Sequence, residues 1–289
     1  MATIHPTALH NRDLLPSHAV RLSPFQTGLL SGWGLFSTLR VYRDVPFALS
    51  DHIERLADDA ARLRVDLGEW LPSLAADFAR LIAANGAHEA MARIYFIRNH
   101  GGLLDMPGQR PTDLLVFTAD LRNWGASARL RVQPDGRFAG APLAATKTLT
   151  WSHNLVLLEE AAAAGFDDVL LLNQHGEVAE CTAANLFIAR GGELLTPPLS
   201  SGALPGVTRK VILRAAPEHG LTVRELALRP EDVCNADEVF LTSSTREIQT
   251  VSALDDQPLP PAGPLTHRVQ ELFRQEVERQ VQRAAAVRS

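Results

Sequence analysis

One lysine with small neighbours is the residue of this chain best suited to covalent chemistry. Only Lys147 and Lys210 are lysines among the 28 lysine and arginine residues of the 289-residue chain. An amine can form a Schiff base and can lose its proton when desolvated, whereas a guanidinium group does neither. Lys147 follows the small-residue run 140–145 rather than the polar face of a helix. We interpret it as a candidate nucleophile; a composition that drifted toward arginine is the alternative.

Two further groups could complement such an amine. Glu180 lies in the apolar segment 178–188 and could supply an acidic partner. The segment 204–208, Leu-Pro-Gly-Val-Thr, opens an expected helix, whose free N–H groups and dipole favour a bound phosphate. Hydroxyl donors from Ser243 and Ser244 could add to that anion site. Each signal is weak by itself, because proline, glycine and serine are common in turns with a structural role only.

Composition and charge exclude several classes of protein. With 46% hydrophobic and 21% charged residues, the chain has the composition of a globular enzyme rather than a disordered protein. Its net charge of −5 gives no electrostatic case for nucleic acid binding. Cys181 and Cys234, its two cysteines, do not make a disulfide framework or a cysteine-rich metal site, so no metal is expected. The absence of a signal pattern and of a long apolar run predicts a cytoplasmic protein with no membrane partner.

Two expected strands of the N-terminal half carry side chains that could face a site. Alternation along the strand 32–42 places Phe36 and Thr38 on the same face. Alternation along a later strand likewise places Arg93 and Tyr95 on one face.

A helix is expected to follow the first of these strands. Ser50 or Asp51 could cap its N-terminus, with Glu54 placed for a capping box. Arg55 lies beside the apolar stripe of this helix, and a surface arginine is the plainer interpretation from the spacing alone. The stripe repeats at helical spacing through Ile53, Leu56, Ala60 and Leu63.

The division of the chain is expected near residue 120. The segment 119–128 has few apolar anchors and is the candidate linker between an N-terminal domain, 1–118, and a C-terminal domain, 129–289. Lys147 lies in the second of these. A final helix, about 265–286, carries an apolar stripe that should pack on a core.

The order of the motifs resembles the class IV aminotransferase family, the fold-type-IV enzymes that use pyridoxal 5′-phosphate (PLP). The resemblance covers nearly the whole chain. Five ordered motifs make a chance match improbable. They are Gly-Trp-Gly-Leu-Phe-Ser-Thr-Leu-Arg-Val-Tyr at 32–42, Asp-His-Ile-Glu-Arg-Leu at 51–56, Lys-Thr-Leu at 147–149 with Glu-Cys-Thr-Ala-Ala-Asn-Leu-Phe at 180–187, Leu-Pro-Gly-Val-Thr-Arg at 204–209, and Glu-Val-Phe-Leu-Thr-Ser-Ser-Thr-Arg-Glu-Ile at 238–248.

The resemblance implies a fold, a cofactor and partners. The fold would be two α/β domains (α+β in overall class), with PLP in the cleft between them. The substrates would be a small-molecule amino donor and a 2-oxo acid acceptor. Family members are usually homodimers whose partner subunit borders the active site, so a homodimer is expected here.

The resemblance also assigns roles to three central residues. Lys147 would hold PLP as a Schiff base and, once released by substrate, would move the proton between the substrate Cα and cofactor C4′. Glu180 would pair with the pyridine nitrogen and keep the ring an electron sink. Arg55 would clamp the phosphate with two hydrogen bonds.

Further cofactor contacts follow from the same resemblance. Leu204 would pack on the face of the ring. The remaining residues would form a cup for the phosphate through backbone amides and hydroxyl groups. The cup comprises Gly206, Val207, Thr208, Ser243 and Ser244.

Two arginines compete for a substrate carboxylate. Arg93, which shares a strand face with Tyr95, matches an arginine that branched-chain enzymes use, although Met91 replaces the aromatic residue expected two positions earlier. Arg98 and His100 spell the Arg-x-His trap of D-amino acid enzymes, although that trap normally lies further beyond the strand. Structural roles are the alternative for both arginines, and the sequence leaves the choice open.

Three functions are weighed. A transaminase acting on a small amino acid or amine is the leading prediction. A 4-amino-4-deoxychorismate lyase, making 4-aminobenzoate and pyruvate, is the alternative, because Thr38 aligns with a threonine that such lyases use in catalysis. A non-catalytic PLP-binding protein is the third, and the intact pair of Lys147 and Glu180 argues against it.

Overall fold

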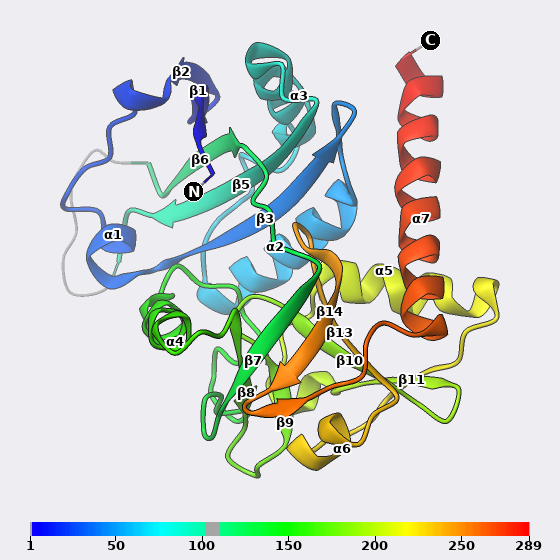
Figure 1. Cartoon of the computed structure of the whole chain (residues 1–289). Helices are drawn as coiled ribbons and strands as arrows, with labels where there is room; N and C mark the ends of the chain where they lie inside the picture. Colours follow the sequence, from blue (N-terminus) through cyan, green and yellow to red (C-terminus); the bar gives the residue numbers. More distant parts are fainter. Residues whose placement is uncertain (1, 102–109, 289) are drawn as a thin grey trace. The chain divides into compact units, whose positions relative to one another are not determined.

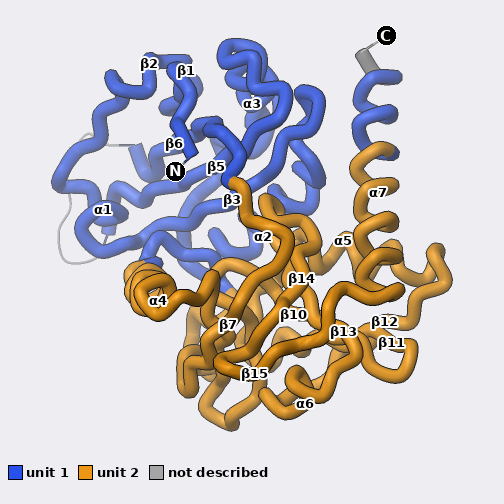
Figure 2. Tube along the Cα trace, viewed as in Figure 1, with its two compact units in different colours: residues 1–122, 146–151, 279–289 blue, residues 123–145, 152–278 orange. Residues whose placement is uncertain are grey.

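The computed structural model describes residues 2–101 and 110–288, which form two compact units (Figures 1 and 2). Each unit has its own sheet and its own helices, so the chain has the mixed α/β architecture expected. Lys147 belongs to the first unit. The division at 119–128 remains a prediction. Unit 1 comprises residues 1–122, 146–151 and 279–289, and unit 2 comprises 123–145 and 152–278.

Unit 1 contains an antiparallel sheet whose described strands run in the order β2-β1-β6-β5-β3-β4. Strands β3 and β5 pair along their whole length, from Gly34 opposite Ile97 to Tyr42 opposite Glu89. The sheet positions the expected substrate face, since β3 and β5 are its neighbouring inner strands. The strands are β1 (Ile4–His10), β2 (Asp13–Pro16), β3 (Gly34–Tyr42), β4 (Val45–Pro46), β5 (Glu89–Arg98) and β6 (Thr112–Ala119).

The helices of unit 1 bury the other side of this sheet. The α2 helix packs on β3, and α3 packs on β1 and β6, around a core that includes Trp70 and Phe78. The expected stripe of α2 is confirmed by the burial of Leu56 and Leu63. The helices are η1 (Ser17–Ala19), α1 (Thr27–Ser31), α2 (Leu49–Leu63) and α3 (Leu74–Asn85).

The expected capping box of α2 is wrong. The helix begins after Ala48, whose φ of 52° lies in the left-handed region, and no described side chain caps it. Asp51 instead lies in the first turn, where its carboxylate suits the positive end of the helix dipole. The short strand β4 ends at Pro46, and the N-cap of α2 therefore falls at Ala48, two residues before Ser50.

Unit 2 contains a mixed sheet, with described strands in the order β12-β11-β10-β13-β14-β7-β8-β9 and β15 on β14. The pairs β11–β12, β14–β7 and β7–β8 are parallel, and the others are antiparallel. The strands are β7 (Ser127–Gln133), β8 (Asp168–Leu172), β9 (Val178–Cys181), β10 (Asn185–Arg190), β11 (Glu193–Thr196), β12 (Val223–Glu225), β13 (Glu238–Ser243), β14 (Glu247–Leu254) and β15 (Gln257–Pro258).

The apolar segment 178–188 forms β9 and most of β10, with a turn between them. The amide of Cys181 donates to the carbonyl of Ala184 at 2.8 Å, which closes a turn between β9 and β10. The two halves have different neighbours, since β9 pairs with β8 and β10 pairs with β11 and β13. A turn is therefore required between Glu180 and Asn185.

Two helices of unit 2 follow candidate residues along the chain: α4 comes after Lys147, and α5 comes after Gly206. The α5 helix contacts β13, and α4 contacts β8. The apolar stripe of α7 is confirmed by the burial of Val269, Leu272, Phe273 and Val277. No helix of the described residues is long and apolar enough to cross a membrane. The helices are α4 (Ser152–Ala163), η2 (Leu199–Ser201), α5 (Val207–Ala215), η3 (Ala216–His219), α6 (Pro230–Cys234) and α7 (Pro264–Arg288), whose last residues belong to unit 1.

Candidate functional site

Lys147 is held against β3 by its backbone. Its carbonyl accepts the amide of Phe36 at 3.1 Å, and the amide of Leu149 donates to Gly34 at 3.0 Å. The neighbouring residue, Thr148, forms a β-bridge with Leu35. Three interactions with one strand fix the position of the lysine backbone, so the side chain is the part that can move.

The amine of Lys147 lies near an aromatic ring and a buried carboxyl group. Its Nζ is 4.6 Å from the centroid of the Phe36 ring, within the range of a cation–π interaction. The backbone N–H of Lys147 donates to Asp59 Oδ2 at 3.3 Å. Burial raises the pKa of Asp59, against the opposing effect of Arg55.

Arg55 is buried and not a surface arginine. It is 8% exposed, and its Nη2 donates to Ser37 Oγ at 2.8 Å. Ser37 Oγ is also 2.7 Å from His52 Nδ1. Burial, and then the charges of Arg55 and Lys147, hold the pKa of His52 well below its ordinary value. Because Ser37 Oγ accepts from Arg55, its own hydroxyl proton is available to the Nδ1 of a neutral His52.

The expected substrate residues of β3 and β5 share one face. Thr38 lies directly opposite Arg93, and Phe36 lies opposite Tyr95 with its ring stacked at 5.6 Å. Arg93 donates to the Tyr95 hydroxyl at 3.0 Å. Its guanidinium carbon is 6.0 Å from the Phe36 centroid, the ring that Lys147 also contacts. Thr38, Arg93 and Tyr95 are thus brought onto the face that carries the lysine amine.

Arg98 and His100 are placed elsewhere. Alternation along β5 puts Arg98 on the same side as Ile94 and Phe96, which are buried in the core of unit 1. The guanidinium carbon of Arg98 is 4.0 Å from the Trp33 ring centroid, and its Nε donates to the carbonyl of His100 at 2.6 Å. These contacts hold the end of β5 against Trp33 and the residue pair that follows the strand.

In unit 2, Glu180 is held by two groups. Arg137 Nη2 donates to Glu180 Oε1 at 3.0 Å, and the amide of Leu204 donates to Oε2 at 3.0 Å. Glu180 is paired with Leu171 in the sheet and is 6% exposed. Both oxygens of the carboxylate therefore have a fixed orientation, and the second donor connects it to the loop before α5.

The loop before α5 is anchored by Asn185. Asn185 Nδ2 donates to the carbonyl of Leu204 at 2.9 Å, and a Cβ placed on Gly206 would collide with Asn185 Oδ1. Gly206 is the N-cap of α5, so Val207 and Thr208 present the first amides of the helix. A side chain at position 206 would displace Asn185 from its contact with the Leu204 carbonyl.

Ser243 and Ser244 lie at the end of β13 on the same part of the sheet. Asn185 pairs with Thr242, the residue before Ser243. The amide of Arg246 donates to Ser243 Oγ at 3.2 Å, which closes the serine turn. Asn185 thus connects the loop before α5 with the strand that ends at Ser243, the two parts of unit 2 that carry the expected phosphate contacts.

These residues fit the groups of PLP. Within unit 1, Lys147 has an amine suited to a Schiff base and Arg55 is a buried arginine; within unit 2, Glu180 is a fixed carboxylate and Gly206 caps a helix N-terminus. When bound, PLP supplies an electron sink that stabilises negative charge at the substrate Cα. Within residues 2–101 and 110–288, no group of three or more His, Cys, Asp or Glu side chains could hold a metal ion.

Four supporting residues were not identified from the sequence. Ser37 and His52 hold Arg55, and Arg137 and Asn185 hold Glu180 and the α5 loop. Ser37 and His52 lie within quoted motifs, so their position beside Arg55 could have indicated a role. Arg137 had no comparable signal, because it is 43 residues from Glu180.

Comparison with known proteins gives the family. The family model described as amino-transferase class IV matches residues 34–254. A proposed branched-chain-amino-acid aminotransferase of Methanocaldococcus jannaschii is 30% identical over 91% of this chain and 94% of its own length. The D-alanine aminotransferase of Bacillus licheniformis is 29% identical over 84% of this chain and 87% of its own.

Solved structures agree with this result. The Escherichia coli branched-chain amino acid aminotransferase has a TM-score of 0.86 and 26% identity over 92% of this chain and 93% of its own. A second branched-chain amino acid aminotransferase, complexed with N-(5′-phosphopyridoxyl)-L-glutamate, has a TM-score of 0.83 and 27% identity, covering 93% of each chain. A proposed 4-amino-4-deoxychorismate lyase of Legionella pneumophila has a TM-score of 0.84 and 25% identity over 90% of this chain and 97% of its own. The chain therefore belongs to the amino-transferase class IV family and is a PLP-dependent aminotransferase.

Proposed function

We propose that this aminotransferase acts on a small amino acid, with Lys147 as the residue that binds PLP covalently and moves the substrate proton. The observation that carries the proposal is the position of the Lys147 amine, 4.6 Å from the Phe36 ring and on the strand face of Thr38, Arg93 and Tyr95. The backbone contacts with β3 hold the lysine in place while its side chain swings between cofactor and substrate. A 2-oxo acid is the acceptor.

Arg93 is the proposed partner of the substrate carboxylate. A planar guanidinium group binds a carboxylate with two parallel hydrogen bonds. Arg93 lies on the same face as the lysine amine, and Tyr95 orients it. Arg98 is on the opposite face of β5 and is engaged with Trp33 and the His100 carbonyl. We assign Arg98 and His100 a structural role at the C-terminal end of β5.

The remaining cofactor contacts are assigned by matching the chemistry of each side chain or amide to a part of PLP. Glu180 is the proposed partner of the pyridine nitrogen, because Arg137 and the Leu204 amide leave its carboxylate in one orientation. Leu204 is the proposed contact to the ring face. Arg55, the α5 amides at Val207 and Thr208, and the Ser243 and Ser244 hydroxyls are the proposed phosphate donors.

A homodimer in the cytoplasm completes the proposal. The short α1 region exposes large apolar side chains: Phe25 is 67%, Leu29 56% and Leu30 58% exposed. Apolar side chains clustered on a surface are typical of an interface between subunits. Both cysteines are free thiols, which suits a reducing compartment. Light scattering of the wild type and of Leu29→Glu tests the dimer, and an unchanged mass would exclude this surface.

The experiment that tests the function follows the visible absorption of the protein loaded with PLP. Mixing with a panel of L- and D-amino acids and amines, without acceptor, should convert the cofactor to its amine form with one enantiomer strongly preferred. Arg93→Gln should raise the KM for the amino acid about tenfold or more and leave the spectrum of the loaded protein unchanged, whereas Arg98→Gln should not.

The same experiment decides between transaminase and lyase activity. A lyase does not leave the cofactor in its amine form. If no donor changes the spectrum and 4-amino-4-deoxychorismate yields pyruvate, the proposed transaminase substrate is wrong. Thr38, which lies opposite Arg93, is then the first residue to mutate.

A further inference from the structure

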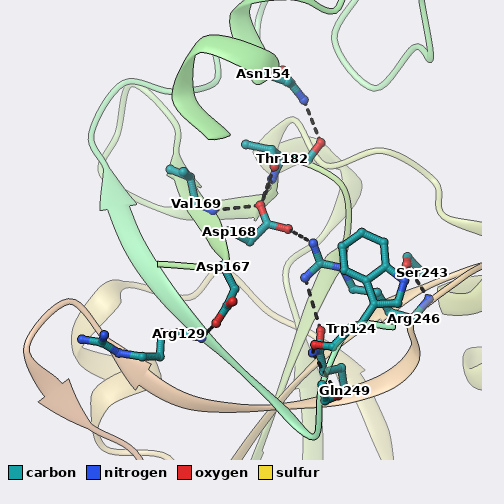
Figure 3. Close-up of polar contacts among 11 residues, drawn as sticks. Trp124, Arg129, Asn154, Asp167, Asp168, Val169, Thr182, Ser243, Arg246 and Gln249 are labelled. Carbon is teal, nitrogen blue, oxygen red and sulfur yellow. Dashed lines mark hydrogen bonds and ion pairs between the residues drawn. The ribbon is translucent and has the colours of Figure 1, made fainter. Parts of the chain in front are cut away.

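A buried ion pair in unit 2 lies outside the residues assigned to the cofactor. Arg246 Nη2 and Asp168 Oδ2 are 2.5 Å apart, with side-chain exposures of 2% and 0% (Figure 3). Removing two charges from water is costly, and an apolar pair of similar volume often stabilises a fold as well or better. The stability of the fold alone therefore does not explain why a buried ion pair is present here. Its connections to the candidate site residues indicate a second role.

Asp168 holds the segment that follows Glu180. Its Oδ1 accepts the amides of Val169 at 2.8 Å and Thr182 at 3.2 Å, and also the Thr182 hydroxyl (Figure 3). Thr182 is two residues after Glu180, at the turn between β9 and β10. One carboxylate at the start of β8 thus restrains the end of the strand that carries the acidic residue.

Arg246 holds the turn that carries the two serines. Its guanidinium carbon is 4.1 Å from the Trp124 ring centroid, and its Nη1 donates to Gln249 Oε1 at 3.3 Å. Gln249 donates in turn to the carbonyl of Trp124 at 2.6 Å. The backbone amide of the same arginine donates to Ser243 Oγ, so the fixed side chain also fixes the serine turn (Figure 3).

A second route closes the network on Glu180. Asn154 Nδ2 donates to the carbonyl of Thr182 at 2.7 Å, and Asn154 Oδ1 accepts from Arg137 Nη1 at 3.4 Å. Arg137 donates to Glu180. Hydrogen bonds and ion pairs within unit 2 therefore connect the acidic residue to the serine turn without a break.

We propose that Asp168 and Arg246 are positioning residues that set the spacing between the Ser243–Ser244 turn and Glu180. The inference rests on the proposed function, in which the turn meets the phosphate of PLP and Glu180 meets the ring nitrogen. PLP is rigid, so the protein groups that bind its two ends must stay at a constant distance from each other. A buried arginine–carboxylate pair, whose guanidinium group is planar, keeps that distance constant. The pair touches neither the phosphate nor the ring.

The test compares PLP with pyridoxal, which lacks the phosphate. Apo-protein is titrated with each compound, and the Kd is read from absorbance and protein fluorescence. Arg246→Met should raise the Kd for PLP about tenfold or more, on the scale of one charged hydrogen bond, and the Kd for pyridoxal less than about threefold. Inorganic phosphate should compete with PLP less well in the variant than in the wild type.

Two further variants keep the test decisive. Asp168→Asn combined with Arg246→Met should weaken PLP binding no more than the arginine change alone, because both act through one pair. Arg190→Met is the matched control, since it removes the more exposed ion pair of Arg190 with Asp232 in the same unit and should leave both Kd values unchanged. If Arg246→Met does not fold by circular dichroism, Thr182→Val carries the comparison, with PLP binding again weakened more than pyridoxal binding.

The outcomes separate this inference from the function on which it rests. Equal weakening of PLP and pyridoxal, or no change in either, overturns the positioning role. In that case a wild type that still binds PLP through Lys147 leaves the proposed function intact. A wild type that binds neither compound contradicts the proposed function itself.

Discussion

The two proposed anion-binding arginines of unit 1 donate hydrogen bonds to hydroxyl groups, whereas two central arginines of unit 2 form ion pairs with carboxylates. In unit 1, Arg55 is held by the Ser37 hydroxyl, and Arg93 by the Tyr95 hydroxyl. In unit 2, Arg137 is paired with Glu180, and Arg246 with Asp168. A hydroxyl partner orients a guanidinium group, which suits a group that is proposed to bind an anion. An ion pair fixes the geometry of both partners, which suits groups that must be held in one orientation.

Two groups of unit 1, the carboxyl group of Asp59 and the imidazole of His52, have pKa values shifted mainly by burial. Burial raises the pKa of Asp59, so this carboxyl group holds a proton more readily than an exposed one. Burial together with Arg55 and Lys147 lowers the pKa of His52, so the imidazole is neutral. We therefore expect losses of anion binding from changes in unit 1, and losses of geometry from changes in unit 2.

The largest effect is expected at the amine of unit 1. Lys147→Ala should abolish turnover and remove the visible band of the covalently bound cofactor, because Lys147 is the residue proposed to form the Schiff base. Absorbance and an aminotransferase assay measure both. Lys210→Ala is the control and should retain both. A Lys147→Ala protein that keeps its turnover would remove this lysine from the mechanism.

In unit 2, the carboxylate of Glu180 should control rate more than binding. Glu180→Gln should leave PLP bound and slow turnover roughly 10²- to 10⁴-fold, because a neutral amide cannot hold a proton on the ring nitrogen in the same way. Arg137→Met should give a smaller loss in the same direction. Glu160→Gln, at an exposed position of α4, is the control. Wild-type rates in Glu180→Gln would contradict the assigned role.

Arg55 should control binding more than rate, which is the reverse of Glu180. Arg55→Ala should weaken PLP binding by about 1.5–3 kcal/mol, the scale of a hydrogen bond to a charged group, with turnover largely restored at saturating PLP. Equilibrium titration of apo-protein measures the change. Arg62→Ala on the exposed side of the same helix is the control. The comparison between the units fails if Arg55→Ala lowers turnover at saturation and leaves the Kd for PLP unchanged.

The smallest effect is expected in the pH dependence of stability. The folded pKa of His52 lies well below 6.5, so the unfolded chain binds a proton that the folded chain excludes. This contribution to stability is present above pH 6.5 and is lost as the pH falls below it. Replacing His52 with Asn should therefore reduce the loss of stability between pH 7.5 and 5.5 by about 1 kcal/mol.

Denaturant unfolding at the two pH values measures this difference. His175→Asn at an exposed turn is the control and should keep the wild-type pH dependence. An unchanged pH dependence in the His52→Asn protein would mean that the Ser37–His52 contact does not require a neutral imidazole.

Much of the architecture follows from local patterns. The alternation in β3 and β5 predicted which side chains share a face, and the structure confirms it for Phe36 and Thr38 and for Arg93 and Tyr95. The stripe of α7 likewise predicted its buried side. These patterns span a few residues, and periods of 2 and 3.6 are properties of the backbone itself. The N-cap of α2 was not predicted, because Ala48 adopts a left-handed backbone conformation that an alanine does not indicate in the sequence.

Residue types and motif order determined the candidates, and tertiary structure decided which partners they have. The sequence by itself indicated Lys147 as a nucleophile, Glu180 as an acid and a helix N-terminus after Gly206. It did not indicate that the Lys147 backbone pairs with β3, or that Asp168 meets Arg246, 78 residues away. Such contacts depend on sheet order and strand register, which are set by the packing of the whole unit rather than by any local period.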